Sequence, residues 1–178
     1  MRLRRTLVAI TASCFLSLGL QTTTASAGVI GTAEYLSATD RAGQVASVQA
    51  SVDAGLEYGK DAVIDHFVIP NITMEVITAI GGSIGDFRQA AALGVIETFS
   101  AASCVVAADA AAKAAEVDVL DVRLAMGLGG KAFCLLSGDV GAVEQAVGAG
   151  AAMAAAQGLL VRQVVIPGVA PEVLRYIL

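Results

Sequence analysis

Residues 138–150 read GDVGAVEQAVGAG, and residues 43–55 carry the same pattern of glycine, valine and alanine in GQVASVQASVDAG. A second matched pair follows, IPGVAPEVLRYI at 166–177 and IPNITMEVITAI at 69–80. The first pair is offset by 95 residues and the second by 97, so the connecting loop differs by two residues. This period is longer than that of a solenoid repeat, which is about 20–50 residues. The 178-residue chain is therefore predicted to contain two copies of one small domain.

The second copy shows a complete order of secondary structure. Apolar runs, glycine turns and the helix-capping residue Ser100 predict four strands and three helices. In chain order these are a strand at 92–98, a helix at 101–115, strands at 117–126 and 131–137, a helix from Gly138 and Asp139, a strand at 159–166 and a short helix from Pro171. The order β-α-β-β-α-β-α predicts an α+β, ferredoxin-like domain, with an antiparallel sheet and two main helices on one face. Strict alternation in the second strand places Val119 and Asp121 on the same face.

The first copy is legible only in its later half. A helix at 43–57, a strand at 62–69 and a short helix from Met74 are expected there. The predicted boundaries are a first domain at 29–80, incomplete or diverged in its N-terminal half, a linker at 81–90 and a complete second domain at 91–178.

Residues 1–28 have the features of a secretory signal peptide. Arginines at positions 2, 4 and 5 precede an apolar run at 7–20, and Ala25-Ser26-Ala27 offers a small-residue cleavage site. Three interpretations stay open: a genuine export signal fused to a truncated repeat, a strongly diverged first half-domain, or a translation from a shifted frame or wrong start.

The composition indicates a chain that buries much of its surface against other subunits; the alternative is an unusually apolar monomer. Apolar residues make up 56% and charged residues only 15%, where a soluble domain has about 25% charged residues. The helices are rich in alanine, whose small side chain lets helices approach closely. A formal net charge of −5 and the lack of a basic stripe argue against nucleic acid as a partner.

No residue pattern in the chain indicates catalysis. Cys14, Cys104 and Cys134 form no metal-ligand spacing with His66, the lone histidine, and the last two cysteines are expected in the core. His66 is expected to be structural. The segment GLGGK lacks the first glycine and the hydroxyl residue of a phosphate-binding loop, so it is discounted.

Four ordered motifs resemble the shell proteins of bacterial microcompartments, which are built from the BMC domain. They are ALGVIET, AADAAAKAAEVDV, GLGGKAFCLLSGDVGAVEQAVGAG and VVIPGVAPEV, all within 91–178, with a looser match at 43–80. With its duplicated domain, the chain resembles the tandem-domain, trimer-forming class of these proteins. It is most similar to the trimeric shell proteins of propanediol-type compartments. The resemblance implies no enzyme but a homotrimer that forms a pseudo-hexagonal tile, packs with other shell proteins in the cytoplasm and encloses enzymes.

The resemblance also implies roles for individual residues. Lys113 matches the family's edge lysine, which meets its counterpart on a neighbouring tile; the alternative is a solvated lysine at a helix end. The five residues Met126, Gly127, Leu128, Gly129 and Gly130 match the loop that lines a central pore for small metabolites, against the alternative of a plain hairpin turn. Leu128 is the side chain expected to narrow the opening.

The chain departs from the family pattern at two places. Where the family often has an arginine after Ile-Pro of the last strand, Asn71 and Gly168 stand in the two copies, so the packing of tile edges is expected to differ. Some relatives hold an iron–sulfur cluster at the pore through a first-copy cysteine, but Cys14 matches no such loop, so no cofactor is expected. An electron-transfer shell protein and an exported small-molecule-binding module remain the alternative functions.

Overall fold

The computed structural model describes residues 6–12, 41–82, 91–124, 129–170 and 172–173, which form two compact units. The first unit spans Met1–Asn71 and the second Ile72–Leu178. Each unit is described by itself.

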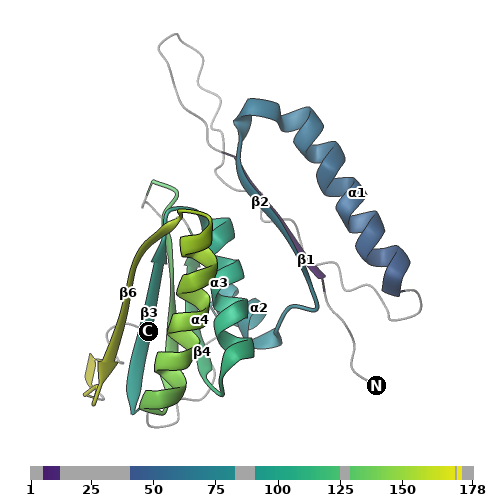
Figure 1. Ribbon diagram of the computed structural model, residues 1–178. Helices are drawn as coiled ribbons and strands as arrows, with labels where there is room; N and C mark the ends of the chain where they lie inside the picture. The colour runs from purple at the N-terminus through teal and green to yellow at the C-terminus, as the bar shows by residue number, and fades with distance from the viewer. Residues whose placement is uncertain (1–5, 13–40, 83–90, 125–128, 171, 174–178) are drawn as a thin grey trace. The chain divides into compact units, whose positions relative to one another are not determined.

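The second unit is an antiparallel sheet with helices packed on it (Figure 1). Its strands lie in the order β4-β5-β3-β6. The elements are α2 (Met74–Ile80), β3 (Ala92–Thr98), α3 (Ala101–Ala114), β4 (Asp118–Leu124), β5 (Ala132–Gly138), α4 (Val140–Ala156) and β6 (Leu160–Pro167). The predicted α+β class and the β-α-β-β-α-β order of these elements are confirmed. Pro171, the predicted start of the last helix, lies outside the described residues.

Small residues bring α4 close to the sheet and to α3. A Cβ added to Gly94 of β3 would lie 2.5 Å from a methyl of Val147 and 2.8 Å from one of Val143. A Cβ added to Gly150 of α4 would lie 2.5 Å from the backbone oxygen of Ala107. Such distances are too short for a real Cβ, so both glycines are required by close packing, as the alanine-rich sequence suggested.

The expected alternation in β4 is wrong at one point. Val119 pairs with Leu136, but Asp121 pairs with Leu135, because a bulge at Leu120 shifts the register. Two residues of β4 that are two apart therefore face opposite sides of the sheet. A bulge adds one residue to a strand and reverses the alternation beyond it, which a strict period of two could not anticipate.

The first unit contains β1 (Thr6–Ala12), α1 (Arg41–Gly59), a 3-10 turn (Lys60–Ala62) and β2 (Val63–Pro70). The helix and strand expected at 43–57 and 62–69 are confirmed. β1, from within the segment with signal-peptide features, pairs antiparallel with β2.

The pairing of β1 with β2 repeats that of β3 with β6. Thr6 pairs with Pro70 as Ala92 pairs with Pro167. Every later pair between β1 and β2 has its equivalent at the corresponding residues of β3 and β6. Even the irregularity recurs, between Thr11 and Ala12 in one pair of strands and between Glu97 and Thr98 in the other. β1 thus occupies, relative to β2, the place that β3 occupies relative to β6.

The two copies also end their last strands in the same backbone conformation. Asn71 has φ 68° and Gly168 has φ 67°, the left-handed region. Glycine and asparagine enter this region more readily than other residues.

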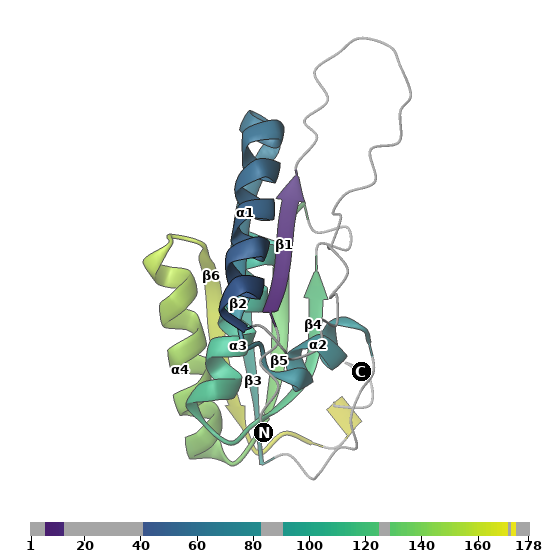
Figure 2. The same ribbon diagram turned by 90° about the vertical axis from the view of Figure 1, so that its right-hand side faces the viewer.

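Helix α2 follows the first of the two repeated segments of sequence. The repeat assigns it to the end of the first copy, yet it lies in the second unit, where it contacts α3 and β4. Both views place it beside these elements (Figure 1, Figure 2). Ile72, Val76 and Ala79 are buried there, so α2 is packed onto the second unit through its apolar side.

Candidate functional site: an edge lysine and a glycine loop

Lys113 lies in the last turn of α3. This helix begins with a cap in which the Ser100 hydroxyl accepts from the Ser103 amide at 2.9 Å, as predicted. At the other end, the Gln145 side chain of α4 donates to the carbonyl oxygen of Ala114 at 3.0 Å. Both ends of α3 are therefore held, and the Lys113 side chain, 42% exposed, projects from a fixed helix.

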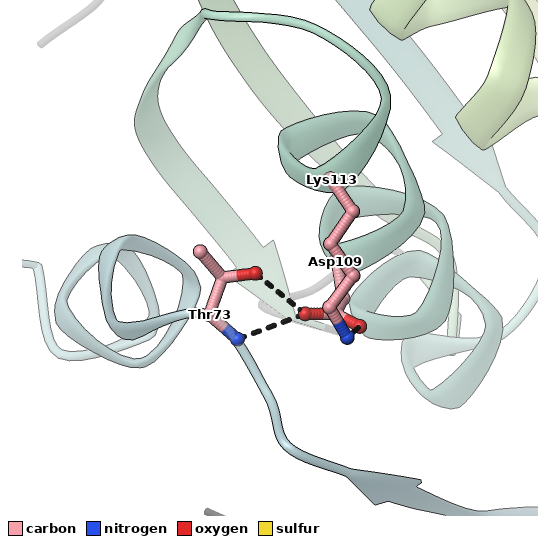
Figure 3. Close-up of polar contacts among 3 residues, drawn as sticks. All are labelled: Thr73, Asp109 and Lys113. Atoms are coloured by element: carbon pink, nitrogen blue, oxygen red, sulfur yellow. Dashed lines mark hydrogen bonds and ion pairs between the residues drawn. The ribbon is translucent and has the colours of Figure 1, made fainter. Parts of the chain in front are cut away.

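The buried carboxylate of Asp109 holds the amine of Lys113 (Figure 3). Asp109 precedes Lys113 by one helical turn, and the two form an ion pair through Oδ2. The other oxygen, Oδ1, accepts from the backbone amide of Thr73 at 2.9 Å and from its hydroxyl at 2.8 Å. The carboxylate thus joins Lys113 to the residue that precedes α2.

Reasoning from the sequence missed the roles of Asp109 and Thr73. The spacing of Asp109 and Lys113 at i and i+4 is a recognised helix pair and could have indicated the ion pair. Nothing in the sequence indicated that Thr73, 36 residues earlier, would reach the same carboxylate.

The glycine loop joins β4 to β5, which pair antiparallel as the predicted hairpin. Met126, Gly127 and Leu128 lie outside the described residues. Gly129 and Gly130 follow with φ of 64° and 90°, values that glycine adopts without strain. A residue with a side chain would therefore be strained at either of these two positions.

Charged and aromatic side chains surround the base of this loop. The Lys131 amine lies 5.4 Å from the centre of the Phe99 ring and 3.8 Å from a carboxylate oxygen of Glu97. The Arg123 guanidinium lies 5.9 Å from the Phe133 ring centre. Both separations suit cation–π attraction. No local sequence pattern indicates this cluster, because the register between neighbouring strands brings its members together.

Cys104 and Cys134 are fully buried, so their predicted place in the core is confirmed. A hydrogen bond with Cys134, together with burial, raises the pKa of Cys104 well above its ordinary value. The thiol is consequently protonated at neutral pH and is a poor nucleophile. Cys14 lies outside the described residues. His66 lies in β2, as predicted, with its side chain exposed; its role stays a prediction.

Comparison with known proteins identifies the family. A family model of the BMC domain matches residues 92–169, which run from the start of β3 to just beyond β6. The bacterial microcompartment shell protein PduT of Citrobacter freundii is 41% identical over 126 residues, covering 70% of this chain and 67% of that protein. The chain belongs to the bacterial microcompartment shell proteins.

A solved structure supports the same assignment. A microcompartment protein from Desulfitobacterium hafniense DCB has a TM-score of 0.65 and 46% identity to this BMC protein. The match covers 74% of this chain and 72% of that one. The resemblance found in the sequence is confirmed, and the chain is a structural shell protein; the comparisons favour neither alternative function.

Among the described residues, no three His, Cys, Asp or Glu side chains gather closely enough to hold a metal ion. In that same part of the chain, no helix combines the length and apolar character needed to cross a membrane.

Proposed function

We propose that the chain is a tandem-domain shell protein, three copies of which form a pseudo-hexagonal tile of a microcompartment shell in the cytoplasm. Each chain contributes two BMC-type domains to a ring of six. The tiles pack edge to edge with copies of themselves and with other shell proteins around enclosed enzymes. We expect the chain to have no catalytic activity of its own.

The repeated strand register is the observation that carries this proposal. The pairs β1–β2 and β3–β6 match residue by residue, and their irregularities fall at equivalent positions. A strand pair of the first unit that reproduces one of a BMC domain supports a duplicated domain. With two domains per chain, three chains supply the six needed for a closed ring.

Lys113 is proposed to contact neighbouring tiles. Its side chain is partly exposed at the end of a helix whose two ends are held. The Asp109 carboxylate holds the amine, and this ion pair fixes the direction in which the partly exposed side chain projects. Edge contacts of this kind recur many times in a sheet, so a small change at each one has a large effect on assembly.

Residues Met126 to Gly130 are proposed to line the tile's central pore, with Leu128 narrowing it. The left-handed backbone of Gly129 and Gly130 supports this role, because glycines leave backbone amides uncovered for anions and polar metabolites. At the base of the loop Lys131 and Arg123 are each paired with a carboxylate, Glu97 and Asp121, so this region is polar without a net positive charge. Small polar metabolites are therefore the class expected to pass.

Native mass spectrometry and electron microscopy test the proposal together. The full chain should have three times the mass of one copy and should form hexagonally ordered sheets. Lys113→Glu should abolish the sheets and leave the trimer intact, because it removes the long amine side chain that meets its counterpart on the neighbouring tile and puts a carboxylate in its place. Lys60→Glu makes the same charge change at an exposed position of the first unit and should leave the sheets. A monomeric chain, or sheets unaffected by Lys113→Glu, would contradict the tile or the edge role respectively.

A further inference from the structure

We propose that Asp109 is a positioning residue that couples the start of α2 to the amine of Lys113. The segment between the two copies would thereby set the geometry of the tile-edge contact. This inference deepens the proposed function, since it rests on Lys113 being at the tile edge.

The carboxylate of Asp109 is shared between two elements (Figure 3). Its side chain is only 7% exposed, and a buried carboxylate needs several partners to offset lost hydration. Thr73 supplies two donors to Oδ1, and Lys113 supplies the opposite charge at Oδ2. Neither partner alone satisfies both oxygens, so each depends on the position that the other gives to the carboxylate.

The position of Thr73 is itself fixed by the packing of α2. Ile72 and Val76, on either side of it, are buried at 4% and 0% exposure. The Thr73 hydroxyl does not cap its own helix, and it donates to Asp109 instead. The contact is therefore part of how α2 is attached to α3, at the junction of the two copies.

The repeat indicates that the hydroxyl contact belongs to this junction alone. Ala170 stands 97 residues after Thr73, at the equivalent position behind the last strand of the second copy. Alanine has no hydroxyl to donate. The within-chain junction thus carries a donor that the equivalent end of the second copy lacks.

Three substitutions in the full chain separate the parts of this coupling. Thr73→Val removes the hydroxyl donor and leaves the ion pair, Asp109→Asn keeps an acceptor oxygen but removes the charge, and Lys113→Met removes the amine. Thr78→Val is the matched control, because it makes the same change within α2, five residues after Thr73, at a hydroxyl that donates to the carbonyl oxygen of Met74 at 3.0 Å.

Two measurements on the soluble trimer read the coupling without relying on sheets. The first is the rate at which an amine-labelling reagent modifies Lys113, followed by mass spectrometry of its peptide. We expect this rate to rise about tenfold in Asp109→Asn and about threefold in Thr73→Val, in proportion to the charge-assisted bonds lost. The second is hydrogen exchange of the amides in 73–80, which should quicken about threefold in Lys113→Met although Lys113 is on another helix.

The coupling is wrong if Thr73→Val labels Lys113 no faster than Thr78→Val and if Lys113→Met leaves exchange in 73–80 unchanged. Asp109→Asn is not needed for this decision, should it fold poorly. Electron microscopy of Thr73→Val then tests the link to assembly, with fewer or less ordered sheets expected than for Thr78→Val. If sheets do not depend on Lys113 at all, the edge role fails while the labelling and exchange results still decide the coupling.

Discussion

Helices α1 and α4 carry the same valine pattern but lie in different surroundings. Val147 of α4 and its counterpart Val52 of α1 are both buried, at 2% and 1% exposure. One turn earlier, Val143 is fully buried, whereas the matching Val48 is only half-buried. Helix α4, which packs on β3, β5, β6 and α3, hides a broad face, whereas α1, which packs on β1 and β2, hides a narrow one.

This difference shows which part of the buried helix face follows from the repeated sequence and which part depends on the elements packed around the helix. The shared pattern fixes which side of the helix meets its own pair of strands. The rest of the buried face depends on α3, β4 and β5, whose counterparts in the first copy are not among the described residues. A shared sequence pattern therefore gives unequal burial when the elements packed around the helix differ.

Removal of residues 1–12 should have the largest effect on this comparison. β1 is the strand partner of β2 among the described residues, and a strand without a partner loses its ladder of hydrogen bonds. Hydrogen exchange of the amides in 63–70 should quicken by about a hundredfold or more, approaching the rate of an unfolded peptide. Mass spectrometry of peptides from β2 measures this change.

The same truncated chain contains its own control. β6 pairs with β3 rather than with β1, so exchange of the amides in 160–167 should stay as it is in the full chain. Unchanged protection of the amides in 63–70 would show that β2 stays folded without β1. The matching register of the two strand pairs would then say nothing about the stability of the first unit.

The sequence predicted the second copy well because its elements are local patterns. Ser100 before an alanine-rich run, and Gly129 and Gly130 between apolar runs, act within a few residues of themselves. The bulge at Leu120, the approach of Gly150 to α3 and the contact of Thr73 with Asp109 depend on partners far along the chain. The pairing of β1 was hidden for another reason, since an apolar run with arginines before it fits a signal peptide and a strand equally well.

Gly150→Ala should give the next largest effect, a loss of about 2 kcal/mol in the stability of the second unit. The new methyl would meet the Ala107 carbonyl oxygen at 2.5 Å and the Ala111 methyl at 3.2 Å, so α4 must move away from α3. Overpacking of this kind costs about 1–3 kcal/mol, while the better helix propensity of alanine recovers less than about 1 kcal/mol. Denaturant unfolding followed by circular dichroism measures the change.

Gly148→Ala is the matched substitution on the same helix. Among the described residues, no atom outside the helix's own backbone lies within 4 Å of the added methyl, so stability should rise by up to about 1 kcal/mol through helix propensity alone. Equal effects of the two substitutions would mean that α3 and α4 do not approach as closely as described, and the contrast between α4 and α1 would weaken.

The smallest expected effect is a pH dependence that belongs to the second unit. Cys104 lies in a closed core, where its hydrogen bond with Cys134 and its burial raise its pKa. In the unfolded chain the thiol ionises above about pH 8.5, while the folded unit keeps it protonated, so the folded state binds more protons and stability falls as pH rises. The free energy of unfolding should fall by about 1.4 kcal/mol per pH unit between the unfolded and the folded pKa, with full stability below pH 8.

Unfolding measured from pH 7 to pH 10 should show this slope in the wild type and a smaller slope in Cys104→Ala. The difference between the two slopes belongs to Cys104, because other groups that titrate in this range are present in both proteins. An identical slope in both proteins would mean that the core of the second unit does not hold this thiol protonated.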